Sequence, residues 1–137
     1  MTKRVLGSTI AAVLLVLLAL MPQVARASCD AQHAQSLAKE GYRYLDQHRW
    51  SDAKTAAGDL VLLSQDCDDS DVRIPAVLHS AYIGSAALHG LGDDAKAAEA
   101  VKAGLMLLDM LQKSGEYKSL YDAMEPRFIV LQHDLKA

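Results

Sequence analysis

Histidine and cysteine are the residue types in this chain best suited to chemistry, and their spacing limits what they can do. The five histidines are His33, His48, His79, His89 and His133. Two metal ligands on one helix lie three or four residues apart, whereas His79 and His89 are ten residues apart and would stand ~15 Å from each other along a helix axis. Cys29 and His33 have a suitable spacing, but we expect the cysteine to form a disulfide. The sequence therefore predicts no metal site and no cofactor.

A run of acidic residues is the other candidate set of metal ligands. Asp66, Asp68, Asp69 and Asp71 would begin a calcium loop of the EF-hand type at Asp66. The sixth position of such a loop requires glycine but holds Asp71, and the twelfth requires glutamate but holds Val77. We therefore expect a solvated loop whose carboxylates favour the N-terminus of the following helix.

Catalytic motifs are absent from the sequence. It contains no glycine-rich phosphate loop, no G-x-S-x-G nucleophile elbow and no H-E-x-x-H zinc motif. Sets of serine, histidine and an acid can be drawn from any chain of this composition, so they favour no particular reaction. We expect that the protein is not an enzyme.

Residues 1–27 have the pattern of a secretory signal peptide. Lys3 and Arg4 precede an unbroken apolar run over residues 10–21, and alanines occupy the −3 and −1 positions of a cleavage site that ends at Ala27. The apolar run is shorter than the ~20 residues that a membrane span needs. We therefore expect cleavage after Ala27 and export to the periplasm.

Two other fates of this segment remain open. One is an uncleaved anchor. The other is lipidation of Cys29, although Arg26 stands where a lipobox has a leucine-like residue.

The two cysteines are expected to form one disulfide after export. Cys29 and Cys67 lie on either side of a turn over residues 46–51, so they would meet at the open end of a hairpin of two antiparallel helices. A redox-active or metal-binding thiol is the alternative, but the chain has no C-x-x-C motif.

Removal of the leader changes the charge of the chain. The full sequence has 14 Lys and Arg against 17 Asp and Glu, and residues 1–27 hold three of the basic residues and no acidic one, so residues 28–137 carry a net charge of −6. This net negative charge argues against a nucleic-acid binder that works by neutralising phosphates. We expect residues 28–137 to form a single α-helical domain that does not associate with the membrane after cleavage.

Apolar and small residues recur at helical spacing throughout that domain, which predicts an all-α fold. The expected helices span about 30–47, 51–65, 71–90 and 93–113, with a last segment over about 117–135. Ser51 would cap the second helix, Pro75 would lie in the first turn of the third, and Pro126 would kink the last segment or break it in two. Five helices joined by short turns predict an array of antiparallel hairpins.

The two hairpins share a pattern of small and aromatic positions at equal offsets. The shared positions are Gly41, Tyr44, Trp50 and Ala53 in the first hairpin and Ser85, Leu88, Asp94 and Ala97 in the second. Over residues 34–111 the sequence thereby resembles the tetratricopeptide repeat family, although the matched alanines are 44 residues apart instead of the usual ~34. The resemblance implies two repeats and a C-terminal capping helix. A generic helical bundle is the alternative.

One side of the third expected helix combines aromatic and polar character. His79, Tyr82 and His89 recur there at helical spacing, and in the repeat register Tyr42 and Asp46 of the first helix would lie on the same concave side. The resemblance implies that these five residues line a groove for a protein or peptide. In the alternative interpretation Tyr82 belongs to the core and the histidines are ordinary boundary residues.

These features together predict an exported, periplasmic, non-catalytic adaptor that binds a protein or peptide partner. The alternative function is an immunity or inhibitor protein that blocks a secreted toxin or hydrolase, which the small size, the export, the single disulfide and the acidic charge also suit. The pattern makes no prediction about the oligomeric state.

Overall fold

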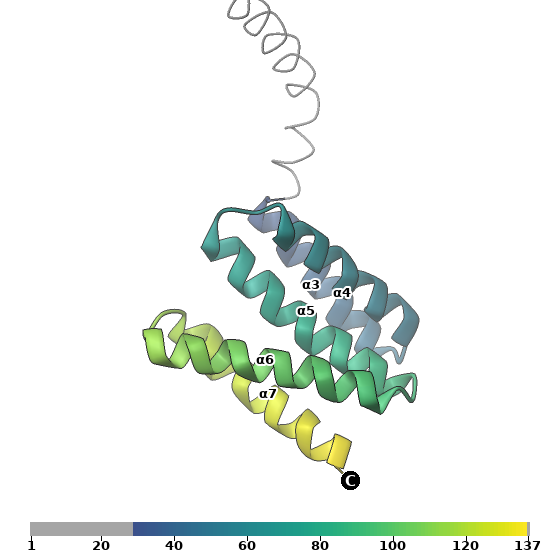
Figure 1. Cartoon of the computed structure of the whole chain (residues 1–137). Coiled ribbons are helices and arrows are strands. Elements are labelled where there is room, and N and C mark those ends of the chain that lie inside the picture. The colour runs from purple at the N-terminus through teal and green to yellow at the C-terminus, as the bar shows by residue number, and fades with distance from the viewer. Residues whose placement is uncertain (1–28, 137) are drawn as a thin grey trace, which may run out of the picture.

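The computed structural model describes residues 29–136, which form five α-helices and, within that range, no strand. The helices are α3 (Ala31–Asp46), α4 (Trp50–Gln65), α5 (Ser70–Gly90), α6 (Asp94–Ser114) and α7 (Lys118–Lys136). The chain reverses direction at each short turn between them (Figure 1). The predicted all-α array of hairpins is therefore confirmed. The predicted signal peptide and the cleavage site after Ala27 lie outside the described residues.

Helix α5 is the centre of the fold, because it packs against all four other helices. Its apolar and small residues point in every direction around the helix, as expected of a helix that is covered on most sides. One side joins a core shared with α3 and α4, which includes Leu60 and Ile83. The other side joins a core shared with α6 and α7, which includes Leu78, Leu108 and Phe128.

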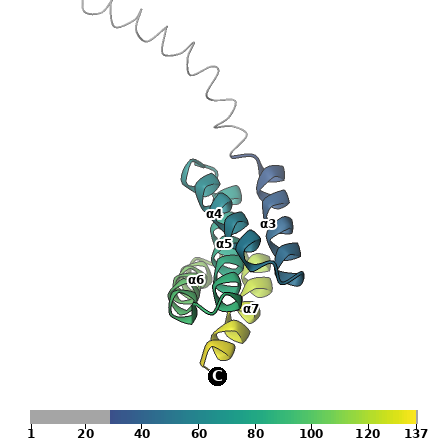
Figure 2. The ribbon, with the colours of Figure 1, turned by 90° about the vertical axis from the view of Figure 1, so that its right-hand side faces the viewer.

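The helices form two layers. Helices α3, α5 and α7 lie next to one another in one layer, because α5 contacts both α3 and α7. Helix α4 packs on α3 and α5, and α6 packs on α5 and α7. Figure 2 shows α3 and α6 on opposite sides of α5. The layer of α3, α5 and α7 leaves one broad face free, and the candidate site lies there.

Small residues bring the helices into close contact, as the sequence pattern predicts. Ala53, Ser85 and Ala97 are fully buried. Gly41 of α3 lies so close to α5 that an added Cβ would stand 2.7 Å from Ile83 Cδ1. A side chain on Gly104 of α6 would overlap the ring of Phe128 in α7. These close approaches set the distances between neighbouring helices.

The disulfide between Cys29 and Cys67 is present, with the two Cα atoms 5.0 Å apart. It ties the start of α3 to the end of α4, at the open end of the first hairpin. At the closed end the backbone of His48 has a φ of 56° and the N–H of Arg49 donates to the Tyr44 carbonyl at 2.8 Å, which turns the chain within three residues. The predicted disulfide pairing is confirmed.

Two local predictions are wrong. Helix α4 begins at Trp50, so Ser51 lies inside the helix, and the N-cap residue Arg49 makes no side-chain capping bond. Helix α5 begins at Ser70, so Pro75 lies in the second turn, not the first; the carbonyl that loses its N–H partner there belongs to the exposed first turn and can bind water.

Of the two outcomes expected at Pro126, a kink or a break, the break does not occur. Helix α7 is continuous through Pro126, and the packing of the apolar stripe around Phe128 stabilises it.

Between Cys29 and Lys136 no helix is both long enough and apolar enough to cross a membrane.

Candidate binding groove

The free face of α3, α5 and α7 contains a hollow of about 810 Å³. All five residues predicted to line a groove, Tyr42, Asp46, His79, Tyr82 and His89, line this hollow. The other lining residues are Leu45, Trp50, Ala86, Gly90, Arg127 and Leu131. We call this hollow the binding groove. Its walls come from three helices far apart in sequence, together with the first residue of α4.

Tyr42 and His79 form the centre of the groove. The hydroxyl of Tyr42 lies 2.7 Å from Nδ1 of His79, across the interface of α3 and α5, and 3.7 Å from the sulfur of Met124 in α7. Burial raises the pKa of Tyr42 to about 12, which keeps its hydroxyl protonated at neutral pH. Burial, and secondarily the charge of Arg127, lower the pKa of His79, so the neutral ring is favoured and can accept a hydrogen bond from the Tyr42 hydroxyl.

Arg127 covers the aromatic floor of the groove. Its guanidinium carbon lies 4.8 Å from the centre of the Tyr42 ring and 5.9 Å from that of Tyr82. The two tyrosine rings stack with their centres 6.0 Å apart, and Tyr82 meets Phe128 edge to face. Among residues 29–136 no carboxylate forms an ion pair with Arg127, and cation–π contacts with the two rings hold its charged group at the groove.

The end of the groove near the helix turns is acidic and aromatic. Asp46, the last residue of α3, is exposed there and makes no ion pair with another described residue. His89 Nδ1 lies 2.8 Å from a carboxylate oxygen of Asp94. Trp50 fits against α5 because Gly90 has no side chain that would overlap its ring, and it stacks on His48. A positive centre and a negative end thus share one hollow.

A second hollow of about 340 Å³ lies on the other side of Tyr42 and His79, between the first halves of α3 and α5. Both residues line the two hollows, so the hollows adjoin at this hydrogen-bonded pair. Close by, the hydroxyl of Tyr117 donates to Asp71 at 2.7 Å, which joins the start of α7 to the start of α5. The free face is therefore hollowed along most of the length of α3 and α5.

Sequence reasoning missed Arg127, Leu131 and Trp50 as groove residues. Arg127 and Leu131 are four residues apart and share one side of α7, but the sequence does not show that this side lies beside Tyr42 and Tyr82. Trp50 was recognised only as a position of the repeat-like pattern. Gly90 lies forty residues away in sequence, and because it has no side chain the Trp50 ring can pack against α5 at the groove. Tyr82 packs on Phe128 in the core and also lines the groove. The two interpretations of this residue, as part of the core and as part of a groove, therefore both describe its position.

The groove offers contacts for recognition: phenol hydroxyls, one free guanidinium, one free carboxylate, and apolar ring faces. Among the described residues no three His, Cys, Asp or Glu side chains come together as a metal site. Comparisons with family models, with curated proteins and with solved structures find no match to this chain, so what the groove binds must be inferred from its own side chains.

Proposed function

We propose that the protein is an exported, non-catalytic adaptor that binds a protein or peptide segment in the groove of α3, α5 and α7. One observation carries the proposal: Tyr42, Tyr82 and Arg127, from three different helices, converge on one open hollow. Tyrosine and arginine are the residue types that dominate the energy of protein interfaces, because they combine large flat surfaces with directional donors.

The shape of the groove favours an extended or helical segment over a small molecule. The hollow is open along one side and continues past Tyr42 into the second hollow, so a ligand can lie along α3 and α5. Arg127 can donate to carbonyl or carboxylate oxygens of such a segment, and Asp46 can accept from its N–H groups or from a basic side chain. The tetratricopeptide-like arrangement supports the same proposal, because repeats of this kind bind partners on a concave face.

Export supports a periplasmic site of action. The leader-like sequence of residues 1–27 and the disulfide between Cys29 and Cys67 both fit an oxidising compartment.

Affinity capture from periplasmic extract, with partners identified by mass spectrometry, tests the proposal. The groove variant is Y42L/Y82L, which removes two groove hydroxyls and rings without changing the charge. The matched control is Y44L/Y121L, because these two tyrosines are also half-buried but line no part of the groove. We expect the control to retain the partners of the wild type and the groove variant to lose them. Equal capture by both variants would show that binding does not use the groove.

A further inference from the structure

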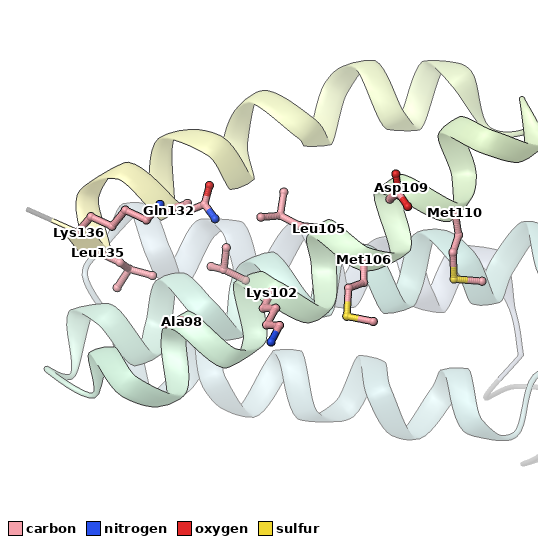
Figure 3. Close-up of a pocket in the computed structure, with 10 residues that line it drawn as sticks. Ala98, Lys102, Leu105, Met106, Asp109, Met110, Gln132, Leu135 and Lys136 are labelled. Carbon is pink, nitrogen blue, oxygen red and sulfur yellow. The ribbon is translucent and has the colours of Figure 1, made fainter.

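Helices α6 and α7 border an apolar hollow of about 650 Å³ that shares no lining residue with the binding groove. Met106 and Met110 of α6 line it, and their residues are 61% and 66% exposed. Figure 3 shows both methionines extending from one side of α6, and Leu105 and Leu135 at the junction of α6 with α7. Neighbouring exposed methionines around an apolar hollow are typical of a surface that another helix covers.

The arrangement of the helices explains why this hollow is open. Helix α5 is covered by four neighbours, whereas α6 and α7 have only α5 and each other as close neighbours. No other helix among residues 29–136 packs on their outer side. The array of hairpins therefore ends in an apolar surface that its own described helices leave uncovered.

Three charged residues line this hollow, Lys102 and Asp109 of α6 and Lys136 of α7, and the two on α6 are complementary to each other. Lys102 and Asp109 lie on one side of α6, seven residues apart, with Leu105 and Met106 between them. Suppose that two α6 helices pair antiparallel, with a twofold axis that passes between Leu105 and Met106. A residue before this midpoint then faces the partner's residue that lies equally far after it. Lys102 and Asp109 each stand ~5 Å from the axis along the helix, so each lysine faces the partner's Asp109.

The same register matches the apolar residues. Leu105 faces the partner's Met106, so apolar side chains lie opposite one another between the two ion pairs. Asp109 now forms an ion pair with Lys113 at 2.9 Å, and because both side chains are exposed to water this pair is weak and easily exchanged.

We propose that the outer side of α6 and α7 is a self-association surface and that a second copy of this chain occupies it. The pairing joins two molecules through a surface distinct from the binding groove, so the dimer carries two grooves. A partner with two binding segments would then be held by both, which raises its apparent affinity without any new contact in the groove.

Charge reversal tests the register of the pairing, with the oxidised, exported protein and light scattering coupled to size exclusion at micromolar to submillimolar concentration. We expect a dimer for the wild type. K102D and D109K each bring like charges together at both contact points, so each variant alone should be monomeric. Mixing K102D with D109K pairs opposite charges again and should restore a dimer of one chain of each, and the double variant K102D/D109K should also dimerise.

The control is K54D, because Lys54 is an exposed lysine on α4 far in sequence from this surface, and it should leave the dimer intact. Thermal unfolding of every variant checks that the monomeric variants are folded. A monomeric wild type at the highest concentration would overturn the proposal, and so would single variants that remain dimeric or a mixture that remains monomeric. These results do not depend on the groove, because neither Lys102 nor Asp109 lines it.

Discussion

The hydrogen bond between Tyr42 and His79 is the most informative single contact in the molecule, because it links two helices and faces the groove at the same time. Burial and the charge of Arg127 favour the neutral form of His79. Arg127 lies over the tyrosine ring, so a proton on His79 would place two positive charges close together. The stability of the folded state therefore depends on the protonation state of His79.

This dependence predicts a pH effect on stability that belongs to His79. Its pKa is lowered in the folded state from the ordinary value of 6.5, so the unfolded state takes up a proton first as the pH falls. The contribution of His79 to the free energy of unfolding is therefore fully present above pH 6.5 and is lost as the pH falls through the folded-state pKa. We expect the free energy of unfolding of H79Q to fall less than that of the wild type between about pH 7.5 and about pH 5.

Urea unfolding at several pH values measures this difference. Glutamine keeps a polar side chain at position 79 but does not titrate, so the other histidines contribute equally to both proteins. Parallel stability curves for H79Q and the wild type would contradict the assignment.

At the scale of helices, close packing of small residues determines which faces meet. Gly41 lets α3 approach Ile83, and Gly104 leaves room for the ring of Phe128. Much of this was predictable: the helical periodicity located all five helices, and the shared small positions predicted burial at Ala53, Ser85 and Ala97. Cys29 and Cys67 were predictable as a pair because one turn separates two helices of similar length.

The side-by-side placement of α7 was not predictable in the same way. Periodicity identifies an apolar side of a helix but not the neighbour that covers it, and so it could not place Arg127 over Tyr42. Helix ends were also uncertain: Ser51 is a good capping residue by type, yet α4 starts one residue earlier because Trp50 packs against Gly90.

Two glycine-to-alanine substitutions distinguish the effect of close packing on stability from the effect of helix propensity. G104A adds a methyl group that overlaps the Phe128 ring, so we expect it to destabilise the protein by about 1–3 kcal/mol. G58A adds the same group in the middle of α4, where nothing lies within 4 Å, so we expect it to stabilise by about 0.5–1 kcal/mol. Urea unfolding measures both. Equal effects of the two changes would show that Gly104 does not mark a close contact between α6 and α7.

The disulfide is a second prediction at the scale of helices. Cys29 and Cys67 are 38 residues apart, and closing a loop of that length stabilises a protein by about 4 kcal/mol on the chain-entropy description. We expect C29A/C67A to lose stability by about 2–4 kcal/mol, since small native disulfides commonly contribute that much. The reduced wild type is the matched control and should show a similar loss. Unchanged stability in both would mean that the first hairpin does not need the bridge.

For the molecule as a whole, the two layers give the protein two kinds of surface. The layer of α3, α5 and α7 presents the groove with its aromatic floor and free charges, and the outer side of α6 and α7 presents an apolar surface with matched charges. The cysteine bridge at one end and the turn at the other hold the first hairpin, which contributes α3 and Trp50 to the groove.

A protein or peptide bound in this groove would contact both Asp46 and Arg127. The most direct measurement is the dissociation constant of a captured partner, by calorimetry, for the wild type, for D46N/R127Q and for the matched control D59N/R73Q. Both variants lose one acidic and one basic exposed residue, but only the first pair lines the groove. We predict that D46N/R127Q weakens binding by about tenfold or more, and that the control binds like the wild type. Equal affinity of all three proteins would contradict binding in the groove.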